Sequence, residues 1–145
     1  HSEEVKSRAL RICRRLGLEP DVLSKIESEE VLPWSSVLSF SQKALLNLAR
    51  ALVCNPHILL IHRPADYLDE ATQSAIMAVL HSFVKHRGIE QDDVAFPLEF
   101  RPPHTCILTT TSLSCLEGAD KVICISKEHG ITTVPKGDVT VEMLR

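Results

Sequence analysis

An unbroken aliphatic run, ILLI at residues 58–61, constrains the fold more than any other stretch of this sequence. A strand that is apolar at every position is typical of a parallel sheet, because such strands are covered on both faces. The run ends abruptly at His62-Arg63-Pro64. Ligands of open α/β sheets bind beyond the carboxyl ends of the strands, so His62 and Arg63 are candidate site residues.

Helical and strand patterns alternate around this run. Periodicity predicts helices at residues 3–16, near 21–28, 41–53 and 69–86, strands at 58–61, 105–110 and 121–126, an edge strand at 131–137 and a final helical turn at 138–145. In the helix at 69–86, the apolar stripe of Ile76, Val79, Leu80 and Phe83 is expected to face inward. This alternation indicates an α/β fold with a largely parallel sheet and flanking helices.

The chain divides into a helical part and a sheet-containing part. We expect residues 1–36 to form a helical lobe and residues 37–145 to form the core with the sheet. Residues 86–104 are acidic, contain proline and lack periodicity, so they are predicted to form an inserted surface loop.

Length and charge limit the classes of function. A chain of 145 residues forms one domain at most, and its formal charge of −3 argues against nucleic acid as a partner. No apolar run is long enough to span a membrane, and no signal peptide is evident. The first residue is His1 and the helical pattern starts at once, so we expect a piece of a larger protein. The five cysteines form no C-x-x-C pair and have no histidine at ligand spacing, which favours structural thiols and no metal site.

Residues 37–52 carry a helix start signal. Ser39 precedes the helix and Gln42 follows three residues later, which is the pattern of a capping box. The free N–H groups of a helix N-terminus also favour an anion. Because most capping boxes only start helices, this pattern alone does not establish a ligand site.

The order of motifs resembles that of ATP-binding cassette (ABC) proteins. Residues 38–42 (LSFSQ) resemble the family's signature L-S-G-G-Q, and the helix that follows ends in ARAL before an aliphatic strand like the Walker B strand. Residues 67–80 resemble the D-loop and its helix, with Leu68-Asp69 at the end of the motif. Residues 105–126 resemble the switch-histidine strand and the strand after it, and residues 130–144 resemble the terminal hairpin and helix. The resemblance covers nearly the whole chain apart from 86–104, and it implies a partial P-loop NTPase-type ABC cassette.

Three positions depart from the family pattern and imply a degenerate hydrolysis site. The Walker B aspartate, which helps to hold Mg²⁺, corresponds to His62, and the glutamate that activates water corresponds to Arg63. The switch histidine corresponds to Thr111. Loss of these groups should remove most phosphoryl-transfer catalysis, and Arg63 could pair with a phosphate but not act as a base.

The signature is altered as well. Phe40 and Ser41 stand where the family has glycines, whereas Ser39 and Gln42 are retained. The nucleotide-facing role of residues 39–42 and a role as a helix cap alone therefore both remain open.

A second register for the Walker B motif would place its acids at Asp69 and Glu70. We reject it, because these acids do not follow the aliphatic strand directly and Pro64 fits poorly in a central strand.

The resemblance also implies cofactors and partners. This sequence has no G-x-x-x-x-G-K-[ST] phosphate loop, which lies upstream in the family, so the isolated chain is expected to bind neither ATP nor Mg²⁺. In the parent protein the resemblance implies ATP, Mg²⁺, the N-terminal half of the same cassette, a second cassette and transmembrane domains, on the cytosolic side of a membrane. The leading hypothesis is a transporter cassette that offers its signature motif to a partner. The alternatives are a non-transporting interaction module and, third, a competent ATPase with unusual residues.

Overall fold

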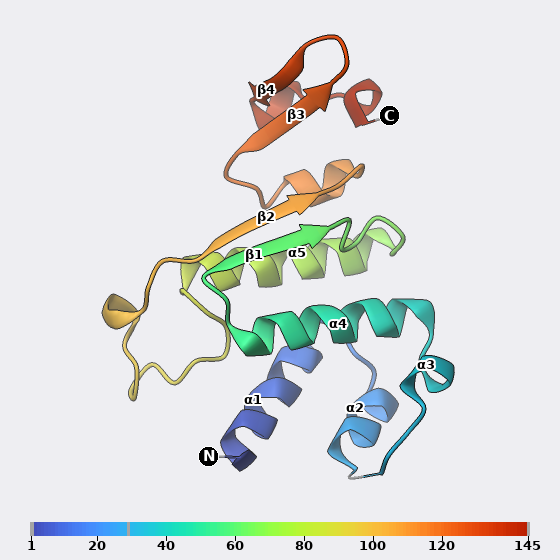
Figure 1. Ribbon diagram of the computed structural model, residues 1–145, viewed down its shortest axis with the longest axis vertical. Coiled ribbons are helices and arrows are strands. Elements are labelled where there is room, and N and C mark those ends of the chain that lie inside the picture. Colours follow the sequence, from blue (N-terminus) through green and yellow to red (C-terminus); the bar gives the residue numbers. More distant parts are fainter. Residues whose placement is uncertain (1, 29, 145) are drawn as a thin grey trace.

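The computed structural model describes residues 2–28 and 30–144 (Figure 1). Its helices are α1 (Ser2–Arg15), α2 (Pro20–Glu27), α3 (Trp34–Val37), α4 (Phe40–Cys54) and α5 (Glu70–Lys85), and its strands are β1 (Ile58–His62), β2 (Thr105–Thr109), β3 (Val122–Ser126) and β4 (Gly130–Val134). Short 3₁₀ turns lie at Leu98–Phe100, Leu113–Leu116, Lys136–Asp138 and Val141–Leu144. The predicted helices and strands are confirmed, including the final turn. The single turn α3 follows Pro33 directly and lies between α2 and α4.

The strands form two separate pairs. β1 and β2 are parallel, with Ile58 opposite Thr105 and His62 opposite Thr109. β3 and β4 form an antiparallel hairpin, because only a short turn joins them. The prediction of a largely parallel sheet is therefore wrong for the second pair. The described residues contain a mixture of helix and strand with one small parallel sheet.

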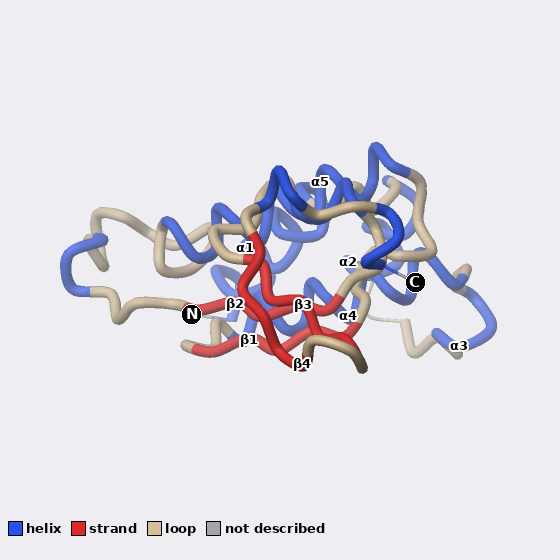
Figure 2. Tube along the Cα trace, turned by 90° about the horizontal axis from the view of Figure 1, so that it is seen from above, coloured by secondary structure: helices blue, strands red, loops and turns tan. Residues whose placement is uncertain are grey.

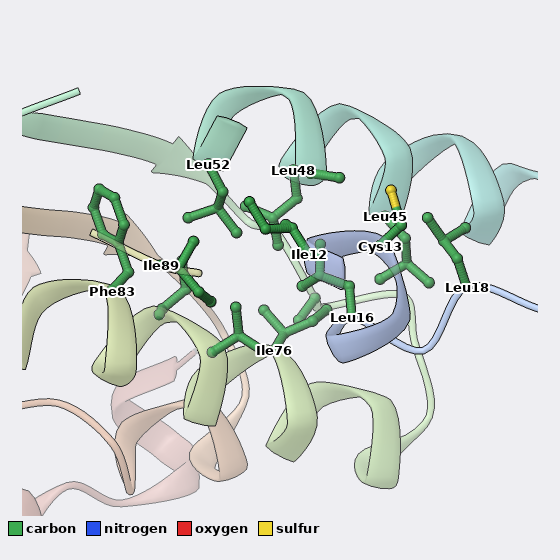
Figure 3. Close-up of a cluster of buried hydrophobic side chains, with 14 of the residues drawn as sticks. Ile12, Cys13, Leu16, Leu18, Leu45, Leu48, Leu52, Ile76, Phe83 and Ile89 are labelled. Carbon is green, nitrogen blue, oxygen red and sulfur yellow. The ribbon is translucent and has the colours of Figure 1, made fainter. Parts of the chain in front are cut away.

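Helices α1, α2, α4 and α5 all contribute side chains to the hydrophobic core, part of which Figure 3 shows. Ile12 of α1, Leu52 of α4 and Ile76 of α5 are fully buried and belong to one continuous cluster. The inward stripe predicted for α5 is confirmed, since Ile76, Val79, Leu80 and Phe83 are all buried. α1 precedes residue 37 and α4 follows it, and both helices contribute to this cluster. The division of the chain at residue 36 stays a prediction.

Local signals fix both ends of α4. The predicted capping box is confirmed, because Ser39 Oγ accepts a hydrogen bond from the Gln42 amide at 3.2 Å and Gln42 Oε1 accepts one from the Ser39 amide at 2.9 Å. Asn55 ends the helix in the left-handed conformation with φ 50°. Pro56 then directs the chain into β1.

Within this chain β1 is covered on one face only, although a strand that is apolar at every position is expected to need cover on both faces. Leu59 is buried in the core, whereas Ile58 is 65% and Leu60 is 71% exposed. Ile107 on β2 is exposed as well. α5 lies against this parallel pair (Figure 1), and no other described segment covers the opposite face.

The segment at 86–104 is irregular, as predicted, but it is more than a surface loop. Ile89, Arg101 and His104 are buried, and the His104 ring packs edge-on against Phe83 of α5 with centroids 4.9 Å apart. These side chains attach the segment to the body of the molecule.

Candidate site at the strand ends

The carboxyl ends of β1 and β2 lie side by side, because the two strands are parallel and in register. His62 is the last residue of β1, and its Nδ1 lies 2.8 Å from the hydroxyl oxygen of Thr109 at the end of β2. Thr111 follows two residues later. The structure therefore brings together the three positions at which the sequence departs from the ABC pattern.

Arg63 is held in one place by neighbours from both strand ends. Its backbone is in the left-handed region with φ 48°, which bends the chain sharply after β1. Its Nε donates to Asp66 Oδ2 at 2.7 Å and its Nη2 donates to Thr111 Oγ1 at 3.0 Å. The guanidinium carbon lies 5.5 Å from the centroid of the Tyr67 ring, within range of a cation–π contact. The hydrogen bond with Asp66 raises the pKa of Arg63, so this side chain stays a cation.

Asp66 is the centre of this network, and sequence reasoning missed it. Its side chain is 2% exposed and pairs with Arg63. It also accepts hydrogen bonds from Thr110 Oγ1 at 2.7 Å, from Thr111 Oγ1 at 2.8 Å and from the Thr111 amide at 3.0 Å. Burial by itself raises the pKa of Asp66, but these donors together lower it to about 2. The available signals were the spacing of Asp66 from Arg63 and the run of three threonines at 109–111.

The carboxylates near the strand ends do not fit a Mg²⁺ site. A carboxylate has about four lone-pair positions, and Asp66 already accepts four hydrogen bonds. Asp69 caps α5 by accepting from the amide and the hydroxyl of Thr72, and these hydrogen bonds lower its pKa. Within residues 2–28 and 30–144, no group of three or more His, Cys, Asp or Glu side chains could hold a metal ion.

The positions of Asp69 and Glu70 bear on the alternative Walker B register. Asp69 is the N-cap of α5 and Glu70 is its first residue, so this acidic pair starts a helix and does not end a strand. Leu68, which precedes Asp69, is partly buried and packs against the core.

Residues 38–42, here called the signature segment after the motif that they resemble, expose the aromatic ring of Phe40. Both polar atoms of the Gln42 side chain form hydrogen bonds. Phe40 is 68% exposed and meets Tyr67 edge-on, with ring centroids 6.2 Å apart. Gln42 Nε2 donates to Glu19 Oε2 at 2.9 Å, while the other side-chain atom of Gln42 is used in the capping box. The carboxylate of Glu19 therefore lies beside the N-terminus of α4, which the sequence did not predict. Ser41 is exposed.

A shallow pocket of about 250 Å³ joins the signature segment to the strand ends. It is lined by Phe40 and Ala44 of α4, by His62, Arg63 and Pro64, and by Tyr67 and Leu68. Small-molecule sites usually enclose about 300–1,000 Å³, so the volume of this pocket lies just below the usual range.

Comparison with known proteins shows which proteins this chain is similar to. No family model matches this chain. The phosphonates import ATP-binding protein PhnC 2 of Cupriavidus metallidurans is 33% identical over 84 residues, which are 58% of this chain and 27% of that protein. Over about 60% of its length this chain is similar to the ATP-binding proteins of ABC transporters.

Two other ABC proteins give matches of similar extent. The methionine import ATP-binding protein MetN of Carboxydothermus hydrogenoformans is 33% identical over 60% of the chain and 23% of its own length. The ABC transporter ATP-binding protein YtrE of Bacillus subtilis is 28% identical over 59% of the chain and 33% of its own length. The ABC-related chain thus spans about a quarter to a third of these relatives. In the described part of the chain, every helix is too short or too polar to cross a bilayer.

Proposed function

We propose that this chain is a portion of an ABC-type nucleotide-binding domain from an ATP-driven membrane transporter, located on the cytosolic side of the membrane. In this proposal residues 1–36 are the helical lobe and residues 37–145 are the C-terminal part of the core. Its partners are the N-terminal half of the same cassette, a second cassette and transmembrane domains, and the complete protein uses ATP and Mg²⁺. The similarity to three ABC ATP-binding proteins supports this assignment.

The hydrolysis site of this cassette is proposed to be degenerate. The observation that carries this proposal is the bonding of Arg63 to Asp66 and Thr111. A general base must accept a proton within hydrogen-bonding reach of the attacking water. A guanidinium cannot do so, and the neighbouring carboxylate of Asp66 is already saturated with donors.

The signature segment is proposed to face ATP held by a partner cassette. The capped N-terminus of α4 supports this role, since the helix dipole and free N–H groups favour a phosphate there. Phe40 fills space that glycine would leave open, and the carboxylate of Glu19 opposes an anion. We therefore expect weak binding of the partner's nucleotide.

A non-transporting interaction module is the second candidate. It is favoured by the same network, because His62, Arg63 and Thr111 all bond to neighbouring residues of their own chain. Such a module would keep the fold and would not use a nucleotide.

ATP turnover of the assembled cassette pair tests the proposal. Ser39→Arg should lower turnover at the partner's site about tenfold, which corresponds to about 1.4 kcal/mol, by blocking the N-terminus of α4. Ser35→Arg, at an exposed position before the same helix, is the matched control and should have no effect.

His62→Asp with Arg63→Glu should raise turnover at the cassette's own site. Asp66→Asn is added to that variant, because a carboxylate at position 63 would face Asp66.

Two results would contradict these roles. If Ser39→Arg leaves turnover unchanged in a folded protein, residues 38–42 act as a helix cap alone. If His62→Ala abolishes hydrolysis at the cassette's own site, the imidazole takes part in the mechanism and the site is not degenerate.

A further inference from the structure

Two histidine side chains meet at the amino ends of the parallel strands. Figures 1 and 2 both show β1 and β2 side by side. Their register pairs Ile58 with Thr105, so His57 and His104 are the residues immediately before this pair. The Thr105 amide donates to the carbonyl oxygen of His57 at 2.8 Å, which extends the pairing to this end. Neither histidine lines the pocket at the carboxyl ends of the strands, so the proposed nucleotide role does not account for them.

The two rings project from the same face of the strand pair. Side chains alternate between the two faces of a strand, so His57 shares a face with Leu59 and His104 shares one with Cys106. Leu59 belongs to the core and Cys106 packs against it, so this is the face toward the core. The ring centroids of His57 and His104 are 5.4 Å apart. Two imidazole nitrogens bound to one tetrahedral Zn²⁺ place their ring centroids about 5 Å apart, so the observed spacing fits a shared ion.

A hydrogen bond fixes the tautomer of His104. Its Nδ1 lies 2.9 Å from the carbonyl oxygen of Pro102, and because a carbonyl oxygen only accepts, Nδ1 carries the hydrogen. In the neutral ring the lone pair is therefore on Nε2. A histidine that ligates a metal almost always donates its other ring N–H to a carbonyl, a carboxylate or water, and His104 has this arrangement.

The lone pair of His104 is buried without a partner. Nε2 is buried and has no hydrogen-bond partner within residues 2–28 and 30–144. Buried polar groups in folded proteins are nearly always hydrogen-bonded or bound to an ion, so this nitrogen calls for a ligand. The Phe83 ring of α5 lies edge-on to His104, with centroids 4.9 Å apart, and holds the imidazole in place. His57 is exposed, so an ion from solution can reach the pair from its side.

The donor atoms select the kind of ion. Imidazole nitrogens suit Zn²⁺, Cu²⁺ and Ni²⁺, whereas Mg²⁺ and Ca²⁺ prefer oxygen ligands. The pair supplies two protein ligands, since the described residues hold no group of three or more His, Cys, Asp or Glu side chains that could bind a metal ion. Water or a donor atom of a bound molecule would fill the other positions. The affinity should therefore be lower than that of a structural zinc site, which has four protein ligands.

We propose that His57 and His104 bind one Zn²⁺ ion through their imidazole nitrogens. The ion would join the start of β1 to the end of the segment at 86–104 and would supply the missing partner of His104 Nε2. The prediction that the chain has no metal site used spacing along the sequence, and strand pairing brings together two histidines that lie far apart in it. This inference does not depend on the proposed nucleotide role, because it uses no residue of the pocket or of the signature segment.

Zinc binding to the 145-residue chain tests the proposal. Competition with a fluorescent zinc indicator is measured at low protein concentration, which limits association between chains. We expect one Zn²⁺ per chain with micromolar affinity, and a large excess of Mg²⁺ should not displace it, because Mg²⁺ prefers oxygen ligands. X-ray absorption of the bound zinc should show two imidazole nitrogens at about 2.0–2.1 Å.

Histidine variants locate the ion. His57→Ala should weaken zinc binding about tenfold or more, since loss of even an outer partner of a metal ligand costs about that much. His104→Ala should weaken it to a similar degree. His81→Ala, at an exposed histidine of α5, is the matched control and should leave the affinity unchanged. If His104→Ala fails to fold, His57→Ala alone decides the result, because the His57 side chain is exposed.

Stability gives a second measurement. An ion that binds the folded chain stabilises it, so saturating Zn²⁺ should raise the urea midpoint of the unsubstituted chain and of His81→Ala but not that of His57→Ala. Equal zinc affinity in His57→Ala and the unsubstituted chain would show an adventitious ion only and would overturn the proposal. Loss of binding in His81→Ala, or sulfur ligands in the absorption spectrum, would place the ion elsewhere and would overturn it as well.

Discussion

At the scale of single residues, one carboxylate organises the candidate site. Asp66 is an acid at the strand ends, but its carboxylate is occupied by the hydrogen bonds that it accepts from Arg63, Thr110 and Thr111. The guanidinium of Arg63 is likewise occupied by the hydrogen bonds that it donates to Asp66 and Thr111. Arg63 and Asp66 therefore form an internal network that joins the turn after β1 to the turn after β2.

This network predicts a pH-dependent stability. Because the folded pKa of Asp66, about 2, lies below its ordinary value of 3.8, its contribution is present above about pH 4 and is lost as the pH falls toward 2. Asp66→Asn should lower the free energy of unfolding by about 1–2 kcal/mol at pH 7. Urea unfolding should show this difference shrinking between pH 4 and pH 2. Asp120→Asn, at an exposed aspartate, is the control, and a difference that does not change with pH would contradict the role of Asp66.

At the scale of elements, α4 has a start signal that can serve stability, ligand binding or both. Its capping box engages the Ser39 hydroxyl and Gln42 Oε1, and Gln42 Nε2 donates separately to Glu19. A cap is a local interaction, so its stabilising effect should persist without any nucleotide.

Substitutions at Ser39 separate the two roles. Ser39→Ala should cost about 1 kcal/mol of unfolding free energy, whereas Ser39→Asp should cost little, because aspartate is also a good N-cap. In the cassette pair, however, Ser39→Asp should suppress partner-site turnover, since it places a carboxylate against phosphate. Urea unfolding and turnover measured on the same variants provide the comparison. Equal turnover for Ser39→Asp and the unsubstituted protein would show that the segment does not face a phosphate.

At the scale of the whole molecule, both strand pairs carry exposed apolar side chains. Ile58, Leu60 and Ile107 on the parallel pair are exposed, as are Ile123, Ile125 and Ile131 on the hairpin. Exposed apolar strands promote association between molecules. We therefore expect the isolated chain to associate as its concentration rises.

Polar substitutions on these faces should reduce the association. Leu60→Thr with Ile125→Thr should favour the monomer in sedimentation velocity at little cost in stability, because both positions are already exposed and threonine suits strands. Leu59→Thr, at the buried position between Ile58 and Leu60, should instead destabilise the fold by about 2–5 kcal/mol. A chain that stays monomeric at high concentration without these substitutions would contradict the expectation and favour the interaction module.

The sequence by itself determined the features that depend on residues close together in the chain. Apolar spacing located α4 and α5 and the buried stripe with Phe83, the Ser39–Gln42 pattern specified the cap, and the motif order indicated the ABC relationship. Each of these signals acts within a few residues or follows the order of segments. None of them requires knowledge of which strands become neighbours.

Only the tertiary structure decided which distant groups meet. Asp66 bonds to Thr110 across 44 positions of sequence, and Glu19 reaches Gln42 across 23. The aliphatic composition of β1 does not distinguish a strand covered on one face from a strand covered on both. The pairing of β3 with β4 depended on the turn between them, which strand patterns do not encode. The physical reason is that burial and hydrogen bonding between distant segments depend on how the elements pack, whereas periodicity and capping depend on neighbours along the chain.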